Sequence, residues 1–228
     1  MNRASLKRAF LATIPVMSGY LAIGIGFGIV VQSRGYGLLW SAAMSTFIYA
    51  GSMQFVALEL MGSGAGLLTA ALTTLMVNLR HVFYGLSMLD RYKNAGKARP
   101  YLIFALTDET YSLVCMPTGL EPEEEKRFFI LVSALNQIYW VGGSILGSVL
   151  GAVLPFSTEG IDFALTALFV SVFVEQWLSV KEHSPALLGL GLSLLCLLLF
   201  GPDAFLIPAM LLIIAALSLI RGRMEVRL

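Results

Sequence analysis

The sequence predicts an all-α integral membrane protein, a polytopic bundle of about six to eight transmembrane helices, some of them broken. Apolar side chains make up 57% of the 228 residues and charged ones only 13%. The mean hydropathy of +0.82 lies well above that of water-soluble domains. The apolar residues also form continuous stretches, each about as long as one helical crossing, without the alternation of barrel strands.

Eight apolar stretches account for nearly all of the chain, so we expect residues 1–228 to form one membrane domain. They lie at residues 10–31, 38–60, 66–89, 100–117, 128–154, 161–179, 184–200 and 203–220. The first stretch is too long for the core of a signal peptide and lacks a clear cleavage site, which makes it a permanent crossing. The linkers leave no room for a separate soluble domain.

Basic residues indicate the orientation, with one contradiction. Segments 3–8 and 221–227 each carry three basic residues, which places both ends in the cytoplasm and requires an even number of crossings. Eight full crossings would put the four basic residues of 91–99 outside, against the positive-inside rule. One resolution is that a segment between residues 38 and 89 enters and leaves on the same side, with an irregular segment near Gly201 restoring the parity.

Glycines suggest close helix packing. Three glycines recur four residues apart at Gly143, Gly147 and Gly151, a spacing that lets another helix backbone approach. The glycines of segment 24–28 alternate instead, so we do not expect them to form one helical face. The linker 62–66 lacks the Lys-Ser/Thr of a phosphate-binding loop and reads as a turn.

Several classes of function find no support. The net charge of +1 gives no reason to expect nucleic acid as a partner. Cys115 and Cys196 are isolated in apolar surroundings, so we expect two buried free thiols and no metal site. No cofactor is expected, and the HExxH and GxSxG motifs of an intramembrane enzyme are missing.

Ionisable side chains inside apolar stretches are the strongest functional signal, because each costs roughly 2.5–3.5 kcal/mol to insert. The third stretch holds Asn78, Arg80 and His81, and the fourth holds Asp108 and Glu109. The adjacent carboxylates should face Arg80, His81 or a watery cavity. The alternatives are a snorkelling arginine, a purely structural salt bridge and a hydrogen-bonded histidine that carries no proton.

Uncharged polar residues mark two further positions. Tyr49, Ser52 and Gln54 surround Gly51 in the second stretch, a pattern typical of a broken helix whose free backbone groups can hold a zwitterion. Plain helix packing through Ala50 and Gly51 explains the pattern equally well. The fifth stretch carries Asn136 beside another amide, either as ligands or as interhelical hydrogen bonds.

At these positions the sequence resembles the AzlC family, the large subunits of branched-chain amino-acid exporters. Four blocks carry the resemblance, and their order and spacing also fit: YAGSMQF at 49–55, VNLRHVFYGLS at 77–87, TDETYSL at 107–113 and GIDFALTALF at 160–169. The resemblance implies a multi-pass protein of the prokaryotic inner membrane. It also implies export of Leu, Ile, Val and sometimes Met, together with a small four-helix AzlD-type membrane subunit.

The residues themselves suggest roles for such a function. A branched-chain amino acid needs a positive group, an acceptor and an apolar pocket. The expected substrate-binding residues are Tyr49, Gly51, Ser52, Gln54, Asn78, Arg80 and Asn136. Proton coupling or ammonium binding is expected of His81, Asp108 and Glu109. Phe47, Phe55, Phe83 and Phe163 either line the side-chain pocket or simply pack.

Two other classes of function stay open beside this one. The chain is a scaffold or binding subunit for another permease, or it is an intramembrane enzyme that uses its acids and histidine. Without a nucleotide-binding motif, a transporter of this sequence must draw on an ion gradient or a partner, and a carboxylate beside His81 suits a proton gradient.

Overall fold

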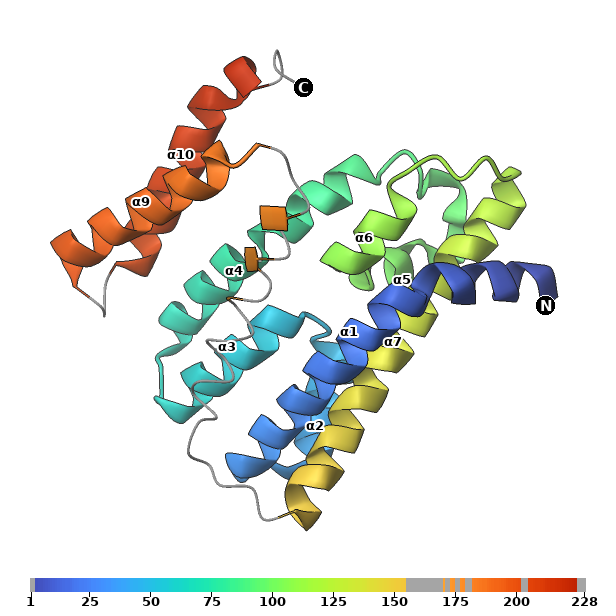
Figure 1. Cartoon of the computed structure of the whole chain (residues 1–228), viewed down its shortest axis with the longest axis horizontal. Helices are drawn as coiled ribbons and strands as arrows, with labels where there is room; N and C mark the ends of the chain where they lie inside the picture. Colours follow the sequence, from blue (N-terminus) through green and yellow to red (C-terminus); the bar gives the residue numbers. More distant parts are fainter. Residues whose placement is uncertain are drawn as a thin grey trace. The chain divides into compact units, whose positions relative to one another are not determined.

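A computed structural model gives the fold of the chain (Figure 1). It describes residues 3–154, 182–201 and 205–224, with isolated positions between 170 and 178. The described residues are helical apart from turns and short links, which confirms the all-α prediction. They fall into two compact units, Met1–Ala164 and Leu165–Leu228.

The first unit is organised around α1 (Arg3–Ser33) and α7 (Pro122–Val153), which lie side by side (Figure 1). Both are long and apolar enough to cross a membrane. Gly143 lies beside Leu21, and Gly147 lies beside Ile25, so residue numbers rise together along the contact and the two helices are parallel.

Glycines bring these two backbones into direct contact. A Cβ atom on Gly28 would lie 2.0 Å from the Ser144 carbonyl oxygen, and one on Gly147 would lie 2.0 Å from the Ile25 carbonyl oxygen. The packing role predicted for the glycines of α7 is therefore confirmed. The three glycines of segment 24–28 do not share one face, as expected: Gly24 and Gly28 meet α7, whereas a Cβ atom on Gly26 would meet nothing within 4 Å.

The second apolar stretch is a helical hairpin made of α2 (Gly37–Phe47) and α3 (Gly51–Gly62). The helix breaks at residues 48–50, where Tyr49 adopts a positive φ of +44°. The base of the hairpin is closed by an ion pair of 2.5 Å between Arg34, just before α2, and Glu59, near the end of α3. The stretch thus enters and leaves at the same end, which is the resolution predicted from the charges.

The third stretch forms α4 (Leu67–Ser87), a helix of 21 residues. At 1.5 Å per residue it spans about 30 Å, enough to cross the apolar core of a bilayer. The linker of residues 62–66 before it is the predicted turn, with Gly64 at a φ of +65°. A short 3-10 helix, η1 (Lys93–Ala98), follows α4.

The fourth stretch is a second hairpin, made of α5 (Arg99–Phe104) and α6 (Asp108–Val114). The two carboxylates lie near the centre of this stretch, as expected, but the sequence analysis does not predict the break just before them. Thr107 accepts a hydrogen bond from the Thr110 amide and so begins a new helix at residue 108. The hairpin returns to its starting end, where Arg91 donates to the carbonyl oxygens of Val114 (2.7 Å) and Met116 (2.8 Å).

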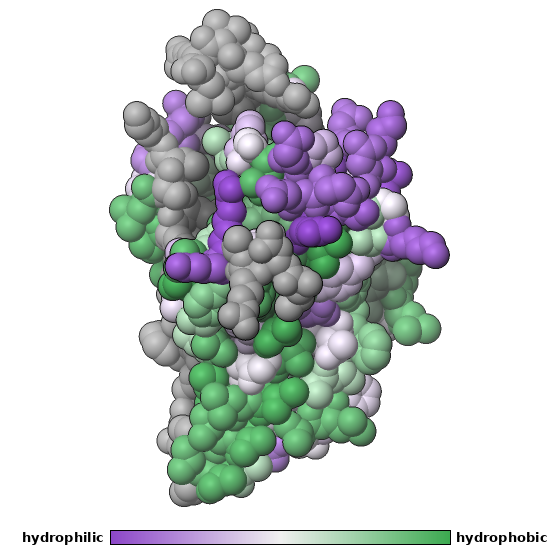
Figure 2. Space-filling model, turned by 90° about the vertical axis from the view of Figure 1, so that its right-hand side faces the viewer, coloured by the Kyte–Doolittle hydropathy of each residue, from purple (hydrophilic) through white to green (hydrophobic). Residues whose placement is uncertain are grey.

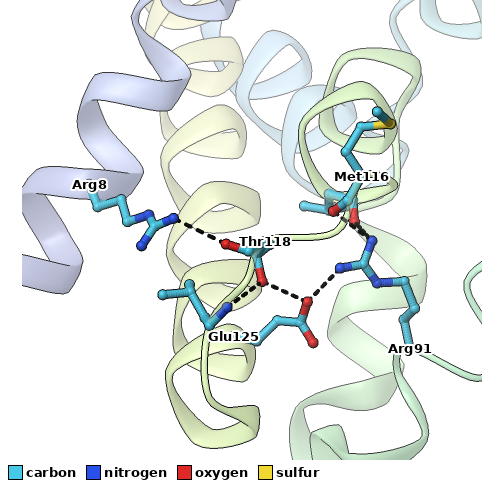
Figure 3. Close-up of polar contacts among 7 residues, drawn as sticks. Arg8, Arg91, Met116, Thr118 and Glu125 are labelled. Carbon is cyan, nitrogen blue, oxygen red and sulfur yellow. Dashed lines mark hydrogen bonds and ion pairs between the residues drawn. The ribbon is translucent and has the colours of Figure 1, made fainter.

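A polar cluster holds this end of the first unit together (Figure 3). Arg8 donates to the Thr118 carbonyl oxygen at 3.2 Å, and the Thr118 hydroxyl donates to Glu125 at 2.8 Å. Arg91 pairs with the same Glu125 carboxylate at 2.5 Å. Beneath them lies an apolar cluster that includes Ala9, Met88, Tyr92, Leu102 and Phe129.

These contacts place the start of α1, the loop after α4 and the start of α7 at one end. The basic residues of 91–99 therefore lie on the same side as those of 3–8, and the charge contradiction disappears. Figure 2 shows hydrophilic residues gathered toward one end of the molecule's face, with an apolar surface over much of the rest.

The second unit contains α9 (Ser184–Phe200) and α10 (Leu206–Met224), which pack against each other. The helix α9 ends at Gly201, at a φ of +74°, where an irregular segment was predicted. Both cysteines are free thiols, but only Cys196 is buried and Cys115 is half-exposed, against the prediction. The stretch 161–179 lies largely outside the described residues. Two of the eight predicted stretches, 38–60 and 100–117, are therefore hairpins rather than single crossings.

Candidate functional site

The two helix breaks meet beside α7. Gln137 of α7 donates to the Thr46 carbonyl oxygen at the end of α2 (3.2 Å) and accepts from the Tyr101 hydroxyl of α5 (2.9 Å). The rings of Tyr49 and Phe104 lie 6.2 Å apart. The hairpins come from opposite ends of the first unit, so their tips converge inside it.

Arg80 of α4 joins the beginnings of the two returning half-helices. Its guanidinium pairs with Asp108, the first residue of α6, at 2.6 Å, and donates to the hydroxyl of Ser52, near the start of α3, at 2.8 Å. The expectation that a carboxylate faces Arg80 is confirmed for Asp108. The arginine is held between two hairpins, and the snorkelling alternative does not describe it.

The ion pair is not saturated. Arg80 Nε and Asp108 Oδ1 are buried atoms without a hydrogen-bond partner among the described residues. The two side chains keep 37% and 27% of their surface exposed. A donor and an acceptor are therefore available to a bound molecule that has both an anionic and a cationic group.

Glu109 has different partners from Asp108. Its carboxylate accepts a hydrogen bond of 2.7 Å from the hydroxyl of Tyr20 on α1. The Tyr20 hydroxyl lies 2.6 Å from the Thr107 hydroxyl, which donates to Thr110 at 3.1 Å. The amide nitrogen of Asn136 on α7 donates to the same Thr110 hydroxyl at 3.0 Å. One hydrogen-bonded chain thus connects Glu109 to Asn136.

Tyr49 at the first break and Asn136 on α7 also carry buried polar atoms without a partner among the described residues. These atoms are the Tyr49 hydroxyl and the Asn136 amide oxygen, on side chains that are 3% and 0% exposed. Leaving a buried polar group unpaired costs about 1–3 kcal/mol. A ligand that bonded both atoms would recover this cost.

Gln54 and Gly51 fit the packing alternative. Gln54 is fully buried, accepts from the Trp140 indole at 2.8 Å and donates to Ser45 at 3.3 Å. A Cβ atom on Gly51 would lie 3.1 Å from the Trp140 ring. Both residues therefore hold the first hairpin against α7.

Asn78 and His81 lie on α4, and their hydrogen bonds and ring contacts among the described residues are local. His81 Nδ1 lies 3.3 Å from the Asn78 carbonyl oxygen, and the Asn78 amide donates to the Thr74 carbonyl oxygen at 3.1 Å. The His81 ring meets the Tyr84 ring edge-on, with 5.9 Å between centroids. This geometry matches a hydrogen-bonded histidine.

The aromatic side chains do not gather in one pocket. Phe55 is buried against Phe27, with ring centroids 5.2 Å apart, whereas Phe47 and Phe83 are 77% and 60% exposed. Phe163, with the whole of block 160–169, lies outside the described residues. Within the part that the structure describes, no group of three His, Cys, Asp or Glu side chains is placed to hold a metal ion.

Sequence reasoning missed Tyr20, the partner of Glu109. A signal was present, because Tyr20, Gly24 and Gly28 are spaced four residues apart and share one helical face. Since the two glycines contact α7, a polar residue on that face belongs in the interior.

A helical bundle with two inward-pointing hairpins and a half-buried ion pair between them is typical of a multi-pass membrane protein. The AzlC protein family model matches residues 15–154. The chain belongs to the AzlC family.

Its relatives support this assignment over nearly the full length. The chain is 43% identical over 222 residues to the branched-chain amino acid transport protein AzlC of Bacillus subtilis, covering 97% of this chain and 87% of the relative. It is 42% identical to an uncharacterized membrane protein of Helicobacter pylori, covering 97% of each. The inner membrane protein YgaZ of Escherichia coli is 30% identical, over 72% of this chain and 70% of the relative. No solved structure matches the chain.

Proposed function

We propose that this chain is the large subunit of a two-component secondary exporter of branched-chain amino acids, driven by the proton gradient. Its substrates would be Leu, Ile and Val, with Met as a further candidate. The name of the Bacillus subtilis relative supports the substrate class. The observation that carries the proposal is the unsaturated ion pair between Arg80 and Asp108 at the meeting point of two broken helices.

The carboxylate of the substrate binds at the start of α3. Ala50, the residue at the N-cap position of this helix, makes no side-chain cap hydrogen bond, so first-turn amides remain for an anion. Arg80, bonded to Ser52 in that turn, adds its charge and its free Nε donor. Broken helices in secondary transporters bind substrate carboxylates in this way.

The ammonium group of the substrate then faces the second hairpin. Asp108 offers its unpaired Oδ1 atom, and Asn136 offers its amide oxygen. The buried Tyr49 hydroxyl offers a further, uncharged contact. Glu109 carries the coupled proton, because it is the carboxylate of the site without an ion pair among the described residues, and His81 is the alternative carrier.

The two hairpins suggest how the site is reached from each side. Their bases lie at opposite ends of the first unit, at Arg34–Glu59 and at Arg91–Glu125. Movement of one hairpin opens the site to one side while the other keeps it closed, which is the requirement of alternating access. A small AzlD-type membrane subunit completes the exporter, and the chain has no enzymatic activity.

Efflux of labelled amino acids tests the proposal. Cells expressing this chain, with and without the small subunit, are loaded with labelled leucine, isoleucine, valine or methionine, and a protonophore is added in parallel. We expect efflux that depends on the small subunit and is abolished by the protonophore. Absence of efflux for all four amino acids would refute the substrate class. Efflux that ignores the protonophore would refute proton coupling alone.

A further inference from the structure

The chain of hydroxyl groups between Glu109 and Asn136 is buried along its whole length. Tyr20 is 4% exposed, Thr107 is 7% exposed, and Thr110 and Asn136 are fully buried. Its members come from α1, from the second helix break and α6, and from α7, so it crosses the centre of the first unit. Water does not compete for these hydrogen bonds, and each hydroxyl hydrogen must be assigned to one contact.

The hydrogens balance when Glu109 is ionised. Three contacts between oxygen atoms lie between Glu109 and Thr110, and three hydroxyl groups supply one hydrogen each. Tyr20 then donates to the carboxylate and Thr107 to Tyr20. Thr110 must donate to Thr107, which reverses the direction that the structure gives this pair. Thr110 accepts from the Asn136 amide nitrogen, which leaves the Asn136 amide oxygen unpaired, as the structure has it.

Protonation of Glu109 reverses the chain. The carboxylic acid becomes a donor, so Glu109 donates to Tyr20, Tyr20 to Thr107 and Thr107 to Thr110. The geometry of the last pair already favours this direction. The Thr110 hydrogen is then released to bond Asn136, which requires the amide oxygen in place of the nitrogen. A half-turn of the amide supplies it, and the oxygen and nitrogen of an amide occupy nearly the same positions.

We infer that Glu109 sets the hydrogen-bonding character of Asn136 through Tyr20, Thr107 and Thr110. With Glu109 ionised, Asn136 presents an acceptor to the substrate-binding space. With Glu109 protonated, it presents a donor. The step adds one proton from water to Glu109, and within the chain only hydroxyl and amide groups rotate, so no bond there is made or broken.

This inference rests on the proposed function and specifies its coupling. A substrate ammonium donates hydrogen bonds and needs the acceptor state of Asn136, so it disfavours the proton on Glu109. Amino acid and proton then occupy the protein alternately, which is the rule for exchange across a membrane. Binding of one ligand opposes the other by the same coupling free energy.

Among the ionisable groups of this region, Glu109 is the one that we expect to gain and lose the proton. The ionisable groups that face it are Tyr20 of α1, Tyr49 of the first break, Tyr84 of α4 and Asp108 of its own helix. Asp108 is already paired with Arg80. Glu109 has no ion pair among the described residues, so nothing but its hydrogen bonds balances its charge.

The first test needs no substrate. The side-chain amide of Asn136 is followed by its nitrogen-15 resonance in the purified full-length chain as pH is lowered, and Asn136→Ser identifies the signal. We expect the resonance to shift in the wild type and to stay constant in Glu109→Gln and Thr110→Val. Tyr20→Phe interrupts the chain of hydroxyl groups at a different residue and should also keep the Asn136 resonance constant. Agreement between the two variants would show that the result does not come from a folding defect in one of them.

Thr13→Val is the matched control. Thr13 is as buried as Thr110 and bonds the Tyr139 hydroxyl at 3.2 Å, but it lies outside the chain. This variant should keep the wild-type shift. An Asn136 shift that persists in Glu109→Gln or in Thr110→Val would overturn the inference.

The second test uses labelled leucine. We expect the affinity of the wild type to fall by about tenfold or more on acidification, within the usual range of coupling between sites. Thr110→Val should still bind leucine at high pH with its pH dependence lost. Retained pH dependence in this variant would refute the inference. If the amide shift follows Glu109 but leucine does not bind, the coupling stands and the proposed substrate is wrong.

Discussion

The two helix breaks face each other but are built differently. The first, at residues 48–50, has Tyr49 at a φ of +44° and leads into α3 without a side-chain cap. The second, at residues 105–107, leads into α6, where Thr107 caps the helix and two carboxylates occupy the first turn. The amides at the start of α3 therefore have no side-chain acceptor, whereas an amide at the start of α6 already has one in Thr107.

This difference gives each break one electrical sign. The open amides of α3 and the adjacent Arg80 make the first break positive. Asp108 and Glu109 make the second break negative. In the proposed function, a zwitterionic substrate binds between them in one orientation, with its carboxylate toward α3 and its ammonium group toward α6. Substitutions at each break test this difference in turn.

Removing the charge of Asp108 should have the largest effect. In Asp108→Asn, Arg80 loses its ion pair and the ammonium group of the substrate loses its charged acceptor. We expect export to be abolished, by at least about 100-fold, as a misplaced group at a reacting or binding centre commonly costs. Efflux is measured as above, with membrane content determined by immunoblotting.

Glu123→Gln is the control for this variant. Glu123 lies at the start of α7, 77% exposed, and its contact with Lys126 is 3.9 Å long. Exposed pairs of this kind contribute about 0–1 kcal/mol, so export should be unchanged. Normal export by Asp108→Asn would show that the charge of Asp108 is not needed to bind the ammonium group of the substrate.

Giving the first break the cap that it lacks should have an intermediate effect. Ala50 has a non-helical backbone at φ −138° and ψ +88°, as N-cap residues do, so we expect a serine there to accept from the first turn of α3. We expect Ala50→Ser to raise stability by about 0.5–2 kcal/mol, the usual contribution of a cap. The same bond uses an amide that the substrate carboxylate needs, so the KM for leucine efflux should rise several-fold. Unchanged KM in a stabilised variant would show that the substrate does not use this helix end.

Sequence reasoning found one of these breaks and missed the other, for a physical reason. The first is marked by a glycine and by polar residues inside an apolar stretch, which signal an irregular helix directly. The second contains neither glycine nor proline. Its signal was a different one: Thr107 followed by Asp108 and Glu109 has the form of an N-cap with acidic residues in the first turn, typical of a helix start.

The sequence predicts the candidate site only to the extent that a charged side chain inside an apolar bundle needs a partner of opposite charge. Arg80 needs a carboxylate inside an apolar bundle, so a partner among Asp108 and Glu109 follows from the sequence alone. Which of the two it is depends on where α6 begins, because adjacent residues on a helix point in different directions. The spacing of Tyr20 with Gly24 and Gly28 predicts an interior position, but its contact with Glu109, 89 residues away in the chain, was not predictable from local pattern.

Removing the cap of the second break should have the smallest effect. Thr107→Ala deletes the oxygen that accepts from the Thr110 amide at 3.2 Å, so thermal unfolding in detergent should show a loss of about 1 kcal/mol. Thr107→Ser keeps an acceptor at the same place and should recover most of that loss. Because the carboxylates of α6 also stabilise its first turn, the helix should survive the change and leucine should still bind at high pH. Loss of leucine binding in Thr107→Ala, with the protein still folded, would mean that the second break binds substrate through its cap and not through its charges, and the contrast between the two breaks would fail.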